Sequence, residues 1–268
     1  MFEYLPTYFS ASAFFVLGMI FGSFFNVCIW RIPRKESIVK PPSHCPSCHS
    51  LIKWYDNIPL VSYLILRAKC RKCGEKISIR YPIVELLTGL LFCSSFLIFG
   101  YQYYTFFVLI YVSFMIIMSF IDIDHFLLPD RFTLTMIPLG IMTIFFRDNF
   151  SFMDSLLGIV TGGGIILIFS AGYYLFRRKI GMGGGDIKLM AGVGAFIGAK
   201  LVLLAILIGT IIALIAAIPY LITKKKGLEA MLPFGPFLAI AAIICLFWGD
   251  IIFDWWLKHP IIRIESMG

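Results

Sequence analysis

The chain has 268 residues, of which 60% are hydrophobic and only 14% are charged. Soluble proteins carry about 25% charged residues, so this composition excludes an ordinary soluble domain and indicates a protein with several membrane spans. The formal net charge of +8 does not indicate nucleic-acid binding, because no long basic tract stands outside the loops between apolar segments.

The first apolar segment covers residues 8–30. It is too long for the apolar core of a signal peptide, and no small-residue cleavage site follows it, so we expect a retained membrane helix. The only extended polar region follows, over residues 31–82. The remaining predicted spans are residues 83–100, 103–122, 131–147, 154–176, 187–198, 200–222 and 232–250. The sequence therefore predicts an all-α polytopic membrane protein with about eight transmembrane helices.

Clusters of Lys and Arg near the ends of spans indicate the orientation, because such residues collect in cytoplasmic loops. The main clusters lie at residues 31–35, 177–179 and 224–226. Eight spans place all three on one face of the membrane. We therefore expect the polar region to be cytoplasmic and both termini to lie outside.

Four cysteines form two CxxC motifs in the polar region, separated by 21 residues: Cys45, Cys48, Cys70 and Cys73. This spacing is typical of four-cysteine zinc ribbons, in which four thiolates close the tetrahedron and the metal is structural. Two disulfides or an iron–sulfur cluster are the alternatives. His44 and His49 flank the first motif and are expected to be bystanders.

Two carboxylate-bearing segments fall at predicted cytoplasmic ends of spans: "IDIDHFLLPD", residues 121–130, and "GMGGGD", residues 181–186. Asp130 is explained by a structural role, in which its carboxylate accepts backbone N–H bonds at a helix N-terminus. Asp122 and Asp124 directly follow an apolar run. On a continuous helix they point about 200° apart, so at most one of them can face Asp186.

Three glycines, Gly183 to Gly185, remove every side chain from the backbone before Asp186. Glycine permits positive φ and close approach of another chain. The span over residues 187–198 is roughly 18 Å long against about 30 Å of hydrocarbon, so it is expected to begin below the membrane surface. A glycine hinge or a helix-packing seam is the alternative.

These motifs resemble the type IV prepilin leader peptidases, a family of GxGD membrane aspartyl proteases. Further segments resemble the same family and follow one another in the family's order: "FGSFFNVCIWRIPR", "YDNIPLVSYLILRAKCRKC" and "PFGPFLA". The family's first catalytic aspartate lies six residues before the Leu of its LPD element, which here is Leu128. The resemblance therefore implies Asp122 and Asp186 as the catalytic pair. It also implies cleavage of a short basic leader from type IV pilin-like precursors, at the cytoplasmic face of the inner or plasma membrane.

Many members of this family also methylate the new N-terminal residue with S-adenosylmethionine. The family has Gly-Lys before the second cysteine pair, whereas this chain has Ala68 and Lys69. The resemblance offers Asn57, Pro59 and Lys69 as candidate cofactor-binding residues. The chain shows no glycine-rich nucleotide loop of a soluble methyltransferase, so the cofactor would bind between the polar region and the membrane helices.

The predicted organisation is a first transmembrane helix over residues 1–30, a zinc-binding and methyltransferase region over 31–82, and a transmembrane protease domain over 83–268. Glu85 could hold a basic leader, although an ion pair with Arg80 or a helix-start position explains it as well. An ion- or proton-coupled transporter accounts for intramembrane carboxylates and broken helices but leaves the four cysteines unexplained. A zinc-stabilised scaffold without enzymatic activity leaves the aspartates unexplained.

Overall fold

The computed structural model describes residues 7–178, 183–223 and 232–258. Within them the regular elements are helices, which confirms the predicted all-α class. In chain order they are α1 (Thr7–Arg31), η1 (Trp54–Asp56), α2 (Val61–Ile65), α3 (Arg80–Phe99), α4 (Tyr103–His125), α5 (Asp130–Met142), η2 (Thr143–Phe146), α6 (Phe152–Arg177), α7 (Gly184–Thr223) and α8 (Gly235–Lys258).

The helices account for the predicted spans. Among the described residues, α1, α3, α4, α6, α7 and α8 are long and apolar enough to cross a membrane. The predicted span over residues 131–147 is formed by α5 and η2, and α7 contains two predicted spans divided at Gly198, whose φ of 77° and ψ of 173° are not helical. The expectation of about eight membrane segments is therefore confirmed.

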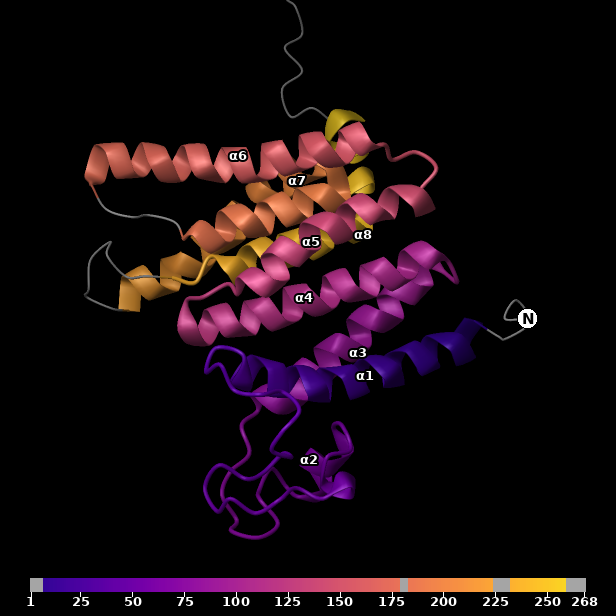
Figure 1. Ribbon diagram of the computed structural model, residues 1–268, viewed down its shortest axis with the longest axis vertical. Coiled ribbons are helices and arrows are strands. Elements are labelled where there is room, and N and C mark those ends of the chain that lie inside the picture. Colours follow the sequence, from indigo (N-terminus) through magenta and orange to yellow (C-terminus); the bar gives the residue numbers. More distant parts are fainter. Residues whose placement is uncertain (1–6, 179–182, 224–231, 259–268) are drawn as a thin grey trace, which may run out of the picture. The chain divides into compact units, whose positions relative to one another are not determined.

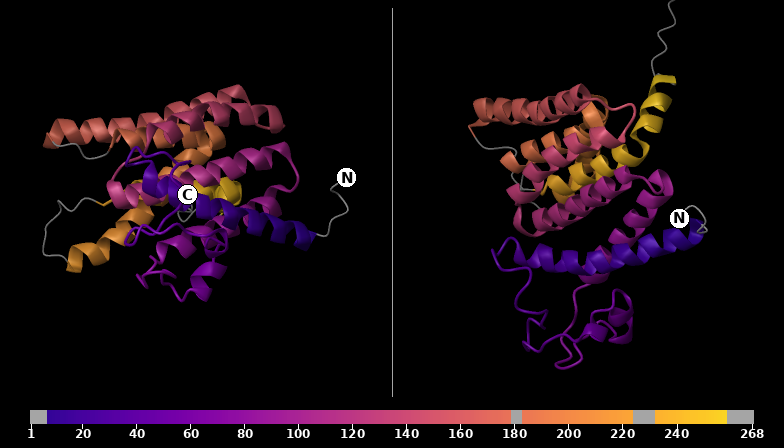
Figure 2. Two further views of the ribbon diagram at one scale, coloured as in Figure 1. Left: turned by 60° about the horizontal axis from the view of Figure 1, so that its bottom comes forward. Right: turned by 45° about the vertical axis from the view of Figure 1, so that its right-hand side comes forward.

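The chain divides into two compact units, Met1–Phe132 and Thr133–Gly268, which we call the N-terminal and C-terminal units. In the N-terminal unit, α1 packs along α3, and the segment between them lies beside the C-terminal part of α1 (Figures 1 and 2). Glycines permit this close packing: a Cβ at Gly18 or Gly22 of α1 would lie within 2.8 Å of α3 backbone atoms. The division of the chain at residues 30 and 82 stays a prediction.

In the C-terminal unit, α6 and α7 run side by side (Figure 1). Their backbones meet at Gly158 of α6 and Gly194 of α7, where a Cβ on either residue would overlap the carbonyl of the other. Gly162, one turn after Gly158, has the same relation to the Met190 carbonyl. This small-xxx-small pattern lets two membrane helices approach closely, so van der Waals contact holds them together.

We expect Gly158→Ala to lower the free energy of unfolding by about 3 kcal/mol, because the new methyl group forces the two backbones apart. Gly164→Ala is the matched control on the same helix, since a Cβ there meets no atom within 4 Å. The control should be neutral or stabilising by up to about 1 kcal/mol, the helix preference of Ala over Gly. Thermal unfolding in detergent measures both; equal midpoints for the two variants would contradict this packing.

Candidate active site and metal site

Asp122 lies in the last turn of α4, and only 6% of its surface is exposed. The helix ends three residues later at His125, because Phe126 takes a left-handed conformation and donates its N–H to the Asp122 carbonyl, 2.9 Å away. This cap stops the helix directly beside the aspartate. A buried carboxylate at the end of an apolar helix is costly to place and is a candidate for chemistry.

Asp124 has a different environment, although it lies only two residues away. Its carboxylate forms an ion pair with the Arg80 guanidinium from the start of α3, and 34% of its side chain is exposed. The pair joins the adjacent ends of α3 and α4, which explains Asp124 as a structural residue. The environments therefore favour Asp122 over Asp124 as the reactive carboxylate of this segment.

Asp186 lies in the first turn of α7, in the C-terminal unit, and is 8% exposed. Its N–H donates to the Gly183 carbonyl at 3.1 Å, which starts the helix. Gly183 and Gly184 do not have positive φ, so a need for the left-handed conformation does not explain glycine at these positions. A methyl group added at Gly184 would meet no atom within 4 Å. The space fits the close approach expected from sequence. Gly181 and Met182 of the motif lie outside the described residues.

The first part of α7 ends at Gly198, as the predicted short span requires. Two side chains donate to carbonyls just before the kink: Arg147 donates to the Phe196 carbonyl at 2.8 Å, and Ser155 of α6 donates to the Ala195 carbonyl at 3.0 Å. A Cβ at Gly198 would lie 3.2 Å from the Phe150 ring. Irregular backbone inside a membrane helix is tolerated when its polar groups are satisfied in this way.

The four predicted metal-binding cysteines converge. One sulfur from each lies within 4.8 Å of all the others, an arrangement that could hold a metal ion: Cys45, Cys48, Cys70 and Cys73. Each CxxC motif makes the same tight turn. The Cys45 N–H donates to the Ser50 carbonyl at 3.0 Å, and the Cys70 N–H donates to the Glu75 carbonyl at 2.8 Å. Thiols this close without disulfide bonds favour metal binding over the disulfide alternative.

The environment of Cys48 favours its thiolate. The Ser50 hydroxyl lies 2.9 Å from the Cys48 sulfur, and this hydrogen bond is the main reason that the pKa of Cys48 is lowered to about 6. Because a metal binds the deprotonated sulfur, a thiol already ionised at neutral pH is a ready ligand.

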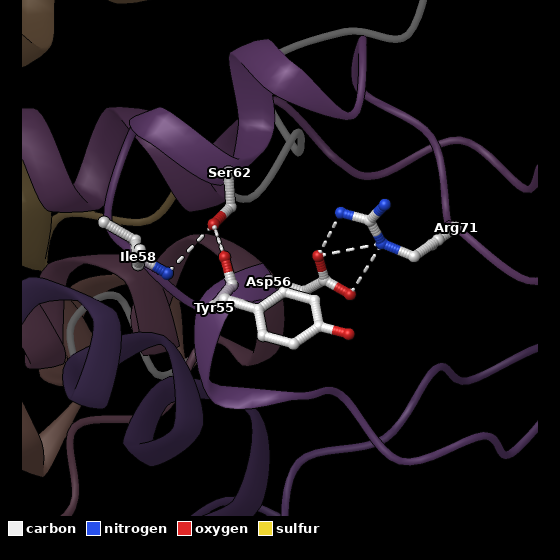
Figure 3. A network of polar contacts seen from close by, with 5 residues as sticks. All are labelled: Tyr55, Asp56, Ile58, Ser62 and Arg71. Carbon is white, nitrogen blue, oxygen red and sulfur yellow. Dashed lines mark hydrogen bonds and ion pairs between the residues drawn. The ribbon is translucent and has the colours of Figure 1, made fainter.

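An ion pair connects the second cysteine turn to η1 (Figure 3). Arg71, between the two cysteines of that turn, binds both carboxylate oxygens of Asp56 at 2.6 to 3.0 Å. On the other side of the same segment, Ser62 of α2 donates to the Tyr55 carbonyl and accepts from the Ile58 N–H, each at 2.9 Å (Figure 3). The second cysteine turn and α2 therefore both hold the segment that contains Asn57 and Pro59.

Ala68, for which the resemblance implies a glycine, has φ of 58°. The left-handed conformation is therefore used at this position, and a Cβ there costs about 1 to 2 kcal/mol. Ala68 also connects α2 to the chain that follows the second cysteine pair. Its N–H donates to the Tyr63 carbonyl at 2.9 Å, and its carbonyl accepts the Ile77 N–H at 2.8 Å. The substitution strains the backbone directly before the second cysteine pair.

We expect Ala68→Gly to stabilise the loop by about 1 kcal/mol, because it removes the strained Cβ. Release of zinc to a competing chelator is the measurement, and Ala68→Gly should slow it. Ala68→Val is the opposing variant and should speed release, since a β-branched residue is least tolerant of positive φ. If zinc were released more slowly from Ala68→Val than from Ala68→Gly, the claim that a Cβ strains the backbone at this position would be wrong.

A cavity of about 500 Å³ lies within the N-terminal unit, between the flank of α1 and the loop. Asn57 and Pro59 line it, whereas Lys69 does not. Ile20, Phe24 and Val27 form its apolar wall on α1. Two of the three candidate cofactor-binding residues are thus brought together, and Lys69 instead pairs with Lys76 in an isolated β-bridge.

Arg31, at the end of α1, fastens the loop beside this cavity. Its guanidinium donates to the Ser37 carbonyl at 2.9 Å and to the Pro41 carbonyl at 2.8 Å, and the residue is buried. The sequence pattern indicates only a positive charge at the cytoplasmic end of a span. A buried arginine that binds two carbonyls of the next segment has no signature in composition or periodicity.

Comparison with known proteins identifies the family. Residues 16–99 match the bacterial peptidase A24 N-terminal domain, and residues 109–218 match the type IV leader peptidase family. A prepilin leader peptidase/N-methyltransferase of Neisseria gonorrhoeae is 37% identical over 92% of this chain and 94% of its own length. The protein of the same name from Legionella pneumophila is 35% identical over 91% and 93%.

A third protein of that name, from Myxococcus xanthus, is 44% identical over 72% of this chain and 58% of its own length. No solved structure matches the chain. The two family models cover most of the first helix, the cysteine loop and both aspartate segments, and the first two relatives align along more than nine tenths of both chains. This chain therefore belongs to the type IV leader peptidase family.

Proposed function

We propose that this protein removes the short basic leader of a type IV prepilin or pseudopilin and then N-methylates the new N-terminal residue. The observation that carries the proposal is the likeness, along more than nine tenths of the chain, to proteins named prepilin leader peptidase/N-methyltransferase. The matched proteins are named as peptidases, and none of these matches supports the transporter or scaffold alternatives.

We assign cleavage to Asp122 and Asp186. Each is a buried carboxylate in a terminal turn of an apolar helix. Two carboxylates that act together share one proton, because like charges at close range cannot both ionise. The ionised member takes a proton from water, and the protonated member polarises the scissile carbonyl and supplies a proton to the leaving amine. Peptide hydrolysis then needs no covalent intermediate.

We assign the cysteine cluster to a structural zinc ion. Four sulfurs within 4.8 Å of one another fit a closed tetrahedral site, which leaves no position for a reactive water. The zinc ion would hold the two CxxC turns together. Because Arg71 of the second turn forms an ion pair with Asp56, the fixed turn would also hold the segment beside the cavity in place.

We assign the cavity beside α1 to S-adenosylmethionine, which supplies an electrophilic methyl group when bound. Its volume of about 500 Å³ is in the range of small-ligand sites, and its lining is mainly apolar with a few polar groups. Asn57 offers an amide donor and acceptor, while Pro59 and Phe24 offer apolar contact. Arg31 also lines the cavity, and its guanidinium donates to the Ser37 and Pro41 carbonyls of the loop.

We place the loop on the cytoplasmic side of the inner or plasma membrane. The support is the positive-inside rule, applied to the basic residues that follow α1 and those near the end of α6. A precursor whose apolar helix lies in the bilayer would present its basic leader on the same side.

The proposal is tested in a bacterium that lacks its own prepilin peptidase, by producing this chain together with a pilin-like precursor. We expect the mature pilin to lack the leader and to carry one added methyl group, both read from its intact mass. Unprocessed precursor in the presence of membrane-inserted protein would overturn the proposal, and a processed but unmethylated pilin would overturn its second half.

A further inference from the structure

Glu85 is a buried acidic residue of the N-terminal unit that neither catalysis nor metal binding uses. It lies in the second turn of α3 and is 8% exposed. The ion pair with Arg80 considered from sequence is not the one that forms, because Arg80 pairs with Asp124. The carboxylate instead accepts the Leu60 N–H at 2.9 Å, and Glu85 packs directly on α1, where a Cβ at Gly22 would lie 2.8 Å from the Glu85 Cα.

The two neighbours of Glu85 belong to the two sides of the cavity. Gly22, on α1, directly precedes the lining residue Ser23. Leu60, in the loop, directly follows the lining residues 57–59. Glu85, behind the wall, therefore packs on the helix side of the cavity and holds the loop side by a hydrogen bond.

The conformation of Leu60 makes this hydrogen bond important for the shape of the wall. Leu60 has φ of 59°, in the left-handed region that residues with a large side chain rarely adopt. Such a conformation persists only where the surroundings hold it. Glu85 holds it from one side, while α2 begins at Val61 on the other.

We propose that Glu85 is a positioning residue for methyl transfer: it fixes the Asn57–Leu60 segment against α1 and so sets the geometry of the cofactor cavity. This inference rests on the proposed assignment of that cavity to S-adenosylmethionine. Leader cleavage is expected to be independent of Glu85, because Glu85 holds the loop by a hydrogen bond and packs on α1, whereas the aspartates lie in α4 and α7.

The test compares Glu85→Ala and Glu85→Gln in the purified full chain, with Glu36→Ala as the control at an exposed glutamate of the same loop. Amide hydrogen exchange of a peptide that covers residues 57–66 reports the hydrogen bond directly. Cleavage and methylation of one precursor give the activities, and their dependence on S-adenosylmethionine concentration gives the KM for the cofactor.

In Glu85→Ala we expect amide exchange of residues 57–66 to rise about tenfold, the KM for S-adenosylmethionine to rise about tenfold, and the cleavage rate to stay within about twofold. Glu85→Gln should stay close to the wild type, because its amide oxygen still accepts the Leu60 N–H and its side chain has nearly the same volume. Glu36→Ala should change none of these quantities.

Unchanged exchange and an unchanged KM in Glu85→Ala would overturn the inference. Equal losses of cleavage and methylation, together with lower thermal stability, would overturn it too, since they indicate a general structural role. A wild type that cleaves without methylating would overturn the second half of the proposed function instead. In that case, increased amide exchange in Glu85→Ala would still support the proposal that Glu85 holds the Asn57–Leu60 segment against α1. Unchanged amide exchange would still overturn it.

Discussion

Asp122→Asn and Asp186→Asn are each expected to lower the rate of leader cleavage about a thousandfold while the protein stays folded in the membrane. Asparagine has nearly the same volume and can keep most hydrogen bonds, but it can neither take a proton from water nor deliver one to the leaving amine. A large effect is expected because the proposed mechanism makes the two carboxylates one proton-sharing unit, so that loss of either would remove the function of both. Leader release from a purified precursor, followed by mass spectrometry, is the measurement.

Asp124→Asn is the matched control for this prediction. It makes the same chemical change two residues away, in the same helical turn, at a carboxylate that is partly exposed and paired with Arg80. We expect a loss of less than about tenfold, from a weaker connection between the ends of α3 and α4. Full activity of Asp122→Asn, or a loss in Asp124→Asn as large as that in Asp122→Asn, would show that the wrong aspartate of this segment was assigned.

Removal of zinc is expected to abolish methyl transfer. Binding of structural zinc contributes about 10 to 16 kcal/mol to the folding of zinc-finger peptides. The loop contains only short helices, so loss of the ion should release both CxxC turns and, through Arg71 and Asp56, the wall of the cavity. Cys70→Ser should have the same effect, because it removes one of the four ligands.

Zinc content by elemental analysis and amide exchange of residues 43–76 test this expectation together. We expect one zinc ion per wild-type chain, less than one in Cys70→Ser, and fast exchange in the variant. Cys93→Ser, on α3 outside the cluster, is the control and should keep its zinc. Pure active protein without stoichiometric zinc would contradict the metal assignment.

Cleavage should suffer much less than methylation from zinc loss. Asp122 and Asp186 lie in α4 and α7, outside the cysteine loop, and neither helix depends on the ion for its hydrogen bonds. The two activities are therefore expected to separate: substitutions of the aspartates remove the first, and disruption of the cysteine cluster removes the second.

The features that can be predicted from sequence are those with a local or regular signature. Long apolar segments predict the membrane helices, and the glycine at residue 198 marks the end of the short span. The CxxC spacing predicts the convergence of Cys45, Cys48, Cys70 and Cys73, because each pair needs only one tight turn. The resemblance implies Asp122 rather than Asp124 through the family's offset from Leu128, and the burial of Asp122 agrees with that choice.

The features that sequence does not predict depend on contacts between distant residues. Glu85 binds a backbone N–H of residue 60, and Arg31 binds carbonyls of the next segment; neither interaction leaves a pattern of side-chain types. Positive φ at Ala68 can be suspected only because glycine is the family's residue there. The contact between Gly158 and Gly194 does not stand out in the sequence, since glycines are common in membrane helices and few of them mark a close approach.

The most direct test of the central claim is the mass of a pilin-like precursor after incubation with the purified protein in detergent. We predict a shorter chain that begins just before its apolar helix, a released basic leader, and no cleavage with Asp122→Asn or Asp186→Asn. An intact precursor with folded wild-type protein, or cleavage at the wild-type rate in either variant, would contradict the claim that this chain is an aspartic prepilin peptidase that uses this pair.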